Sequence, residues 1–226
     1  MPARKDPEHT PADKSSAASA SDAVFHGIVS GLETSQFVPG QRLVETDLAA
    51  QFGVGRNSVR EALQHLAADG VIDIVRHKGA VVRSLTLQET LGVLDVAERM
   101  TGLLARSAAQ AVKNGGPAKA LPPALERLDN AAASSAEDFA QARRHFYRVL
   151  LDLSGSQELR RLLRVIHMPI VHAQHRLGSL REMRLRDYEA IGRAVLQGNA
   201  AKADEAGAAH VRHVRAEILK KAGEGP

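Results

Sequence analysis

Cysteine and tryptophan are both absent from the sequence. Without cysteine the chain can form no disulfide framework, no thiolate zinc site and no cysteine nucleophile. Aromatic residues make up only 3% of the chain, which argues against surfaces that stack nucleic-acid bases or sugars. No hydrophobic run approaches the length of a membrane span, and residues 1–22 lack the apolar segment of a signal peptide. We therefore expect a protein that works in the cytoplasm.

The remaining composition is that of a globular protein, with 44% hydrophobic and 25% charged residues among 226. This length favours one or two domains. The net charge of +4 is compatible with nucleic-acid binding but does not establish it. Residues 22–85 carry six Lys or Arg against seven Asp or Glu, and residues 86–226 carry 21 against 16. Any DNA contact by the first part must therefore come from the positions of its few cations.

The N-terminal part has the order of a winged helix-turn-helix. Residues 1–21 are rich in proline, alanine and serine without periodicity, which predicts a disordered tail. Within residues 22–85, three helices are predicted: one capped by Asp22 that runs through Leu32, one from Thr46 to Phe52, and one from Arg56 to Asp69. Apolar stretches at residues 71–75 and 80–82 follow, joined by the turn 76–79, and predict a hairpin.

The C-terminal part, residues 86–222, is predicted to be an all-helical ligand-binding and dimerisation domain. Thr86 and Glu89 form a capping box at its start. A long helix to residue 113 follows, and further helices are expected over residues 121–132, 137–153, 158–176, 180–197 and 200–221. Pro169 should kink the fourth of these six. The fold class is mainly α, a winged helix-turn-helix followed by an all-α helical bundle.

The third predicted helix carries the residue types that read DNA. Arg is the usual bidentate partner of guanine and Asn that of adenine, and the first turn of such a helix reaches the bases first. The hairpin turn can enter a minor groove or lie along phosphates. The alternative is a solvated helix face in which Arg56 and Arg60 pair with Glu61 or Asp47. The candidate DNA-binding residues are Arg42, Arg56, Asn57, Ser58, Arg60, Arg76, His77, Lys78 and Gly79.

Residues 39–49, 52–63 and 66–70 resemble the DNA-binding domain of the GntR family, with matching spacing and the Gly79 wing turn. The resemblance implies that Arg56, Arg60 and the wing contact operator DNA. The family usually has Ser, Thr and Pro where this chain has Gly55, Asn57 and Ser58, which predicts an unusual operator sequence.

The helical part resembles the FCD (FadR-like) subgroup of that family, through Phe146-Tyr147, Ser154-Gly155-Ser156, residues 194–199 and His210. The resemblance implies a ligand site inside the bundle and a homodimer. Many members hold a divalent metal with one Asp and three His. Those four positions fall on Arg143, Tyr147, Tyr188 and His210. Because three ligands are replaced, one of them by a cation, we expect no metal there.

The same four residues could instead bind the carboxylate of an effector, with an Arg fork and two phenols as donors. The charge excess of this part also favours an anion, and Arg99 could face the pocket. The alternative is that Arg143 pairs with a nearby Glu while the tyrosines simply pack. The spacing of His172 with His175, and of His210 with His213, could also suit zinc, with His167 nearby, although such pairs are more often solvated.

We therefore expect a ligand-responsive transcription regulator, a repressor that binds a palindromic operator as a homodimer and responds to a small organic acid. One alternative is an enzyme or metal-dependent sensor fused to a DNA anchor, but no nucleophile elbow, phosphate loop or metal signature supports it. The other is a sequence-independent DNA protein, which the net charge of residues 22–85 disfavours.

Overall fold

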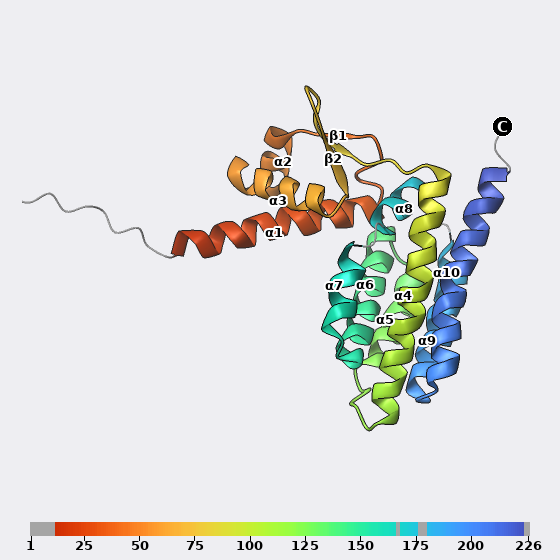
Figure 1. Ribbon diagram of the computed structural model, residues 1–226. Helices are drawn as coiled ribbons and strands as arrows, with labels where there is room; N and C mark the ends of the chain where they lie inside the picture. Colours follow the sequence, from red (N-terminus) through yellow and green to blue (C-terminus); the bar gives the residue numbers. More distant parts are fainter. Residues whose placement is uncertain (1–11, 166–167, 176–179, 224–226) are drawn as a thin grey trace, which may run out of the picture.

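In the computed structural model, two domains are joined near residue 86, and residues 12–165, 168–175 and 180–223 are described (Figure 1). The first domain contains α1 (Ala12–Glu33), β1 (Arg42–Leu43), α2 (Glu45–Phe52), α3 (Arg56–Ala68), β2 (Ile72–Val75) and β3 (Gly79–Val82). The strands form an antiparallel sheet in the order β1-β3-β2, and its hairpin projects away from the second domain. This is the predicted winged helix-turn-helix.

The core of the first domain forms between α1 and α3. Apolar residues at helical spacing give each helix one buried face, and the two faces pack together. The fully buried members on α1 are Val24, Ile28 and Leu32, and those on α3 include Val59 and Leu66. Because the contact is apolar and continuous, α1 and α3 form one packed unit.

Two tight turns set the geometry of this domain. Gly53 caps α2 in the left-handed region with φ 65°, so only Val54 and Gly55 lie between this cap and the start of α3. The turn between β2 and β3 needs two more left-handed residues, His77 with φ 65° and Gly79 with φ 79°. Glycine adopts this region without steric cost.

The second domain is a bundle of α4 (Leu87–Lys113), α5 (Leu121–Ala132), α6 (Ala136–Ser154), α7 (Gln157–Val165), α8 (Met168–His175), α9 (Arg181–Leu196) and α10 (Ala200–Gly223). Its first helix begins with the predicted capping box, because the Thr86 hydroxyl accepts from the Glu89 amide while the Glu89 carboxylate accepts from the Thr86 amide. α4 and α10 lie side by side along their length (Figure 1).

Two glycines permit the close approach of α4 and α10. A Cβ atom added at Gly207 would lie 2.7 Å from the carbonyl oxygen of Thr101 and 3.0 Å from Cα of Gly102. A Cβ atom added at Gly102 would lie 2.5 Å from a carboxylate oxygen of Asp204. Hydrogen therefore replaces the side chain at this crossing because there is no room for a methyl group.

Three expectations from the sequence need correction. The first helix begins at Ala12 and contains Asp22, so residues 12–21 are not a disordered tail and Asp22 is not a cap; residues 1–11 lie outside the described residues. The wing has a third strand, β1. In place of one helix over residues 158–176, the structure has α7 and α8 on either side of residues 166–167, which lie outside the described residues. Pro169 is the second residue of α8, where its missing amide hydrogen costs no helical bond.

Candidate functional site

The N-terminus of α3 presents Arg56 and Asn57 to solvent. Among the described residues, Arg56 has no carboxylate within ion-pair distance, so its guanidinium is available to a base edge. Ser58 is different, because only 9% of it is exposed and it belongs to the inner face of the helix. Its side chain is therefore poorly placed for the DNA contact that was predicted.

Arg60 forms a surface ion pair. Its Nε donates to Oε2 of Glu45 at 2.8 Å, and the two side chains are 60% and 37% exposed. The partner is thus Glu45 rather than Glu61 or Asp47. Exposed pairs of this kind contribute little to stability, so DNA phosphates can compete for the guanidinium.

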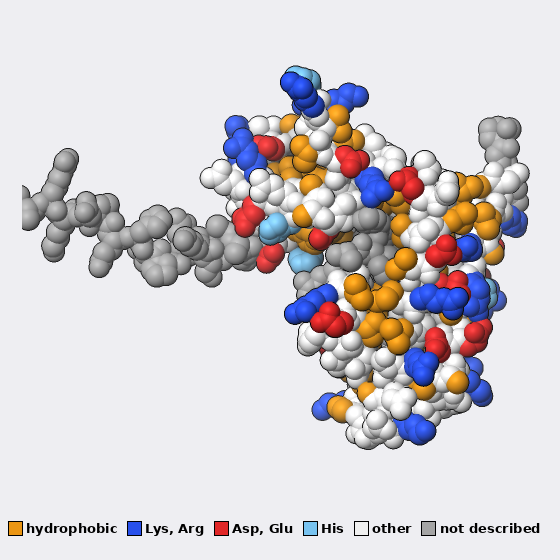
Figure 2. All heavy atoms as spheres, in the orientation of Figure 1, with side chains coloured by type: hydrophobic (Ala, Val, Ile, Leu, Met, Phe, Trp, Pro, Cys, Tyr) orange, Lys and Arg blue, Asp and Glu red, His pale blue; other side chains and the backbone are white. Residues whose placement is uncertain are grey.

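The wing carries the other predicted cations. Arg76, His77, Lys78 and Gly79 are all exposed at the tip of the hairpin, and Figure 2 shows their basic side chains together at the outermost point of the domain. Arg42 is exposed on β1, which pairs with β3. Helix α3, the wing and Arg42 are therefore all accessible to a duplex.

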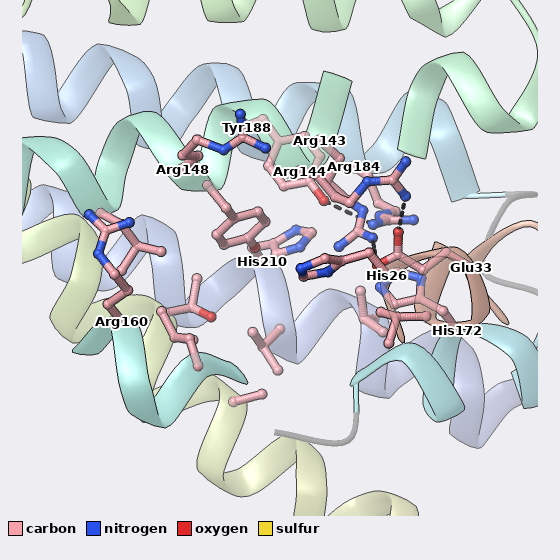
Figure 3. Close-up of a pocket in the computed structure, with 18 of the residues that line it drawn as sticks. His26, Glu33, Arg143, Arg144, Arg148, Arg160, His172, Arg184, Tyr188 and His210 are labelled. Atoms are coloured by element: carbon pink, nitrogen blue, oxygen red, sulfur yellow. Dashed lines mark hydrogen bonds and ion pairs between the residues drawn. The ribbon is translucent and has the colours of Figure 1, made fainter. Parts of the chain in front are cut away.

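A cavity of about 400 Å³ lies where α1 meets the helical bundle. Arg143, Tyr147, Tyr188 and His210 all line it, so the structure brings the four residues together. Figure 3 labels Arg143, Tyr188 and His210 among the residues of the wall. They come from α6, α9 and α10. Helix α1 supplies another part of the wall, so the cavity is shared between the two domains.

Aromatic rings form one side of this cavity. Tyr188 is completely buried, and its ring centroid lies 4.8 Å from that of His210 and 6.0 Å from that of Tyr147. Burial raises the pKa of the Tyr147 phenol, so the hydroxyl keeps its proton and can donate a hydrogen bond.

Arg143 pairs with Glu33, the last residue of α1. The neighbouring Arg144 binds the other oxygen of the same carboxylate and also binds Glu137 at 3.0 Å. Burial alone would lower the pKa of Arg143 and raise that of Glu33, but the attraction between them outweighs it in both cases, so both stay charged. The alternative in which Arg143 pairs with a Glu is therefore the one found in this structure.

Arg184 is the second buried cation of the cavity, and it is not among the effector residues predicted from the sequence. Only 3% of it is exposed, and its Nη2 donates to the Tyr188 hydroxyl at 2.9 Å. Its Nε has no hydrogen-bond partner, and within the described ranges no carboxylate pairs with it. Its position four residues before Tyr188 would have placed it on the same helix face.

Comparison with known proteins agrees with this architecture. The model of the family "Bacterial regulatory proteins, gntR family" matches residues 20–82, and the FCD domain model matches residues 93–213. An HTH-type transcriptional regulator of Mycobacterium tuberculosis is 31% identical over 220 residues, covering 87% of this chain and 85% of its own length. The chain belongs to the GntR family.

Two further similarities support the same placement of this GntR-family chain. An HTH-type transcriptional regulator of Agrobacterium vitis is 30% identical over 93 residues, which are 41% of this chain and 54% of that protein. The structure of Escherichia coli McbR/YncC superposes with a TM-score of 0.77 at 18% identity, covering 90% of this chain and 98% of that one, and it supports the fold alone. The GntR-family chain is thus a DNA-binding transcription regulator with an FCD domain and not an enzyme.

The histidines of this GntR-family protein have different surroundings. His172 is buried and lines the cavity, and burial lowers the pKa of its imidazole well below the usual value, helped by the charges of Arg143 and Arg184. His210 and His213 share the carboxylate of Asp187, at 3.0 and 2.9 Å. Burial would raise the pKa of Asp187, but these two histidines lower it.

No zinc pair of the predicted kind is assembled from these histidines in the described ranges. The Nε2 atom of His175 lies 3.4 Å from the Thr90 hydroxyl oxygen, so its described polar contact is with Thr90 and not with His172. His167 lies outside the described residues. Within the part of the chain that the structure describes, no group of three or more His, Asp or Glu side chains is arranged to hold a metal ion.

One predicted effector residue of this GntR-family regulator is misplaced. Arg99 is exposed on α4 and does not line the cavity, whereas its neighbour Ala97 does. Glu98, between them, binds Arg212 on α10 at 3.0 Å.

Among the described helices, none combines the length and hydropathy needed to cross a bilayer.

Proposed function

We propose that this GntR-family regulator is a repressor that binds a palindromic operator as a homodimer and leaves it when a small organic acid enters the cavity. Two copies related by a two-fold axis present two recognition helices to two half-sites. Because its target is DNA, we propose that it is located in the cytoplasm. The effector is a carboxylate, bound without a metal ion.

The DNA-reading groups of the structure are accessible. Arg56 and the wing cations are exposed, and no described part of the chain covers them. The sign that we propose, repression relieved by the effector, is that of a ligand which favours a form with lower operator affinity. The operator-release experiment below tests this sign.

The observation that carries the effector proposal is the buried Arg184 without an anion partner. A buried guanidinium is costly unless an anion and hydrogen bonds compensate it. Here the Nε donor is unused, and the side chain lies at a cavity whose volume, about 400 Å³, is in the range of small-molecule sites. A carboxylate supplies both the charge and the acceptors that Arg184 lacks. The tyrosine hydroxyls and His172 are further polar groups around it.

The donor set does not suit the divalent metal that the FCD resemblance implies. Arg143 is a cation at the position of the expected Asp ligand, and it would repel a metal ion. Tyr147 keeps its proton because burial raises its pKa. Of the four residues only His210 is of a type that commonly binds metal ions. Its Nδ1 already forms a hydrogen bond with Asp187. This chemistry favours direct binding of the acid by protein donors.

An operator-release experiment tests this function. Duplexes selected from a random pool by the protein supply the operator, and fluorescence anisotropy follows its release as small organic acids are added in the presence of EDTA. Two chains per duplex and release by an acid are expected. Release that requires an added metal, or an acid that tightens the complex, would contradict the proposal. Arg184→Met is the matched control, because it should bind the operator and ignore the acid.

A further inference from the structure

Glu33 is the only acidic residue among the described residues that line the cavity. Its side chain is 7% exposed and points into a group of basic side chains (Figure 3). Five arginines line the same cavity: Arg143, Arg144, Arg148, Arg160 and Arg184. The guanidinium groups that bind the Glu33 carboxylate would bind the carboxylate of a ligand through the same kind of charged hydrogen bonds.

The partners of Glu33 are on the other domain. Arg143 and Arg144 belong to α6 of the bundle, and Glu33 ends α1 of the winged domain. The carboxylate stays ionised, because the two arginines hold its pKa below the usual value in spite of its burial. Each oxygen of Glu33 accepts from one arginine. A charged group that an effector could replace therefore adds to the apolar contacts, such as those of α1 with α8, that hold the winged domain on the bundle.

Helix α1 connects this contact to the DNA-reading helix. Phe25, His26 and Val29 of α1 also line the cavity, so a ligand that fills it touches the winged domain directly. On its other face α1 packs against α3 through a continuous apolar core that includes Ile28 and Leu66. A displacement of the end of α1 would therefore be transmitted to α3.

We propose that Glu33 acts as a built-in competitor of the effector. The carboxylate of the acid takes the place of Glu33 on Arg143, with Arg184 as its second cation, and the release of Glu33 frees α1 and α3 from the bundle. This inference rests on the proposed acid-binding function and adds how binding reaches DNA. The competition lowers the apparent affinity for the acid, because the cavity must first be vacated by Glu33.

The effect is reciprocal by thermodynamic necessity. If the acid and the docked position of α1 exclude each other, then anything that holds α1 in place must weaken acid binding. Removal of the Glu33 charge should accordingly strengthen acid binding, although the residue does not contact the acid in the bound state. A residue that merely supported the pocket would have the opposite effect when replaced.

The test compares Glu33→Gln with the unaltered protein by titration calorimetry in EDTA, with acetate, succinate and benzoate as probes. The Gln variant keeps the shape but removes the competing charge and leaves Arg143 without an anion, whereas Arg144 keeps Glu137. We expect at least a ten-fold lower Kd for one or more probes. Asp152→Asn is the matched control, because Asp152 also pairs with an arginine of the cavity wall, Arg160, but lies on α6 outside the cavity lining and is 62% exposed. It should bind the probes as the unaltered protein does.

The outcomes separate the two proposals. Equal or weaker binding by Glu33→Gln, with binding lost in Arg184→Met, would overturn the competition and leave the acid site intact. Failure of all three probes to bind the Gln variant, in which Arg143 lacks an anion, would overturn the competition and the acid-binding function together.

Hydrogen exchange gives an independent measurement on the ligand-free proteins. Amides of residues 25–36 should exchange faster in Glu33→Gln, and a probe that binds the unaltered protein should produce the same increase. Binding of a probe without any change in these amides would contradict the release of α1. If the Gln variant does not fold, Glu33→Asp takes its place, since the shorter side chain keeps the charge but reaches the arginines less well and should give a smaller gain in affinity.

Discussion

The carboxylate of Glu33 accepts a hydrogen bond from the guanidinium of Arg143, 110 residues further along the chain. The first residue ends the helix that packs against the DNA-reading helix, and the second lies in the helical bundle. Both side chains are largely buried, at 7% and 10% exposure. A buried charged contact therefore joins the part that reads DNA to the part that surrounds the cavity.

Arg143 and Arg184 should respond in opposite directions to replacement by Met. Arg143→Met leaves the buried Glu33 with Arg144 as its remaining partner, so the free energy of unfolding should fall by about 3 kcal/mol, the lower end for a broken buried pair. Arg184→Met removes a buried cation that has no anion, so unfolding should cost about 1 kcal/mol more. Urea denaturation of both variants checks the contrast, and a loss of stability in Arg184→Met would show that this cation is already compensated.

Arg56 and Lys78 should differ in what they contribute to DNA binding. Arg56→Ala should weaken binding to a selected operator by about 1–3 kcal/mol and leave binding to random DNA unchanged, because base contacts carry the discrimination. Lys78→Ala should weaken both about equally and reduce the salt slope by roughly one ion, as expected of a phosphate contact. Anisotropy titrations at several salt concentrations measure both. Equal losses on the two DNAs for Arg56→Ala would refute its role in base reading.

His172 should make the protein less stable in mild acid. Burial, together with the charges of Arg143, Arg184 and His210, lowers its pKa well below the usual value of 6.5. In mild acid the unfolded chain therefore binds a proton at this imidazole that the folded chain does not bind. The free energy of unfolding should therefore be unaffected by His172 above pH 6.5 and fall below it, by up to about 1.4 kcal/mol per pH unit.

Denaturant titrations between pH 7.5 and 5.5 measure this dependence. In His172→Gln the slope below pH 6.5 should be smaller, and what is left belongs to His175 and His210, whose pKa values burial also lowers. An unchanged slope in the variant would mean that His172 is accessible to protons in the folded protein.

The crossing of α4 and α10 predicts opposite effects for two Gly→Ala changes. Gly207→Ala places a methyl group 2.7 Å from the Thr101 carbonyl oxygen, so the helices must separate and stability should fall by about 1–3 kcal/mol. Gly92→Ala, also within a helix, meets nothing within 4 Å and should stabilise the protein by roughly 0.5–1 kcal/mol through helix propensity. Thermal unfolding of the two variants tests the close packing, and a neutral Gly207→Ala would contradict it.

Most of the fold could be predicted because its boundaries have local signals. The Thr86–Glu89 capping box and Gly155 mark helix ends that the structure reproduces. β1 could not be predicted, since two residues are too few for a periodic pattern and its pairing with β3 is non-local. The start of α1 was also wrong, because alanine-rich residues 12–21 continue a helix whose later turns are held by packing on α3.

The cavity residues also divide into those that local spacing or the family resemblance could place and one that depends on how the domains pack. Arg143 and Tyr147 share a helix face through their spacing, and the resemblance to the FCD subgroup added Tyr188 and His210. Arg184 was within reach of the same spacing argument from Tyr188. Glu33 was not, because its position in the cavity depends on how two separate domains pack, and no local pattern encodes that contact.

A thermal-shift screen of small organic acids, with EDTA present throughout, tests the central claim most directly. An acid at about 100 times its Kd should add roughly 2.7 kcal/mol to the stability of the folded protein, which gives a clear rise in Tm. The account predicts such a rise for at least one acid and its loss in Arg184→Met. A rise that occurs only after zinc or nickel is added, or one that persists in Arg184→Met, would contradict it.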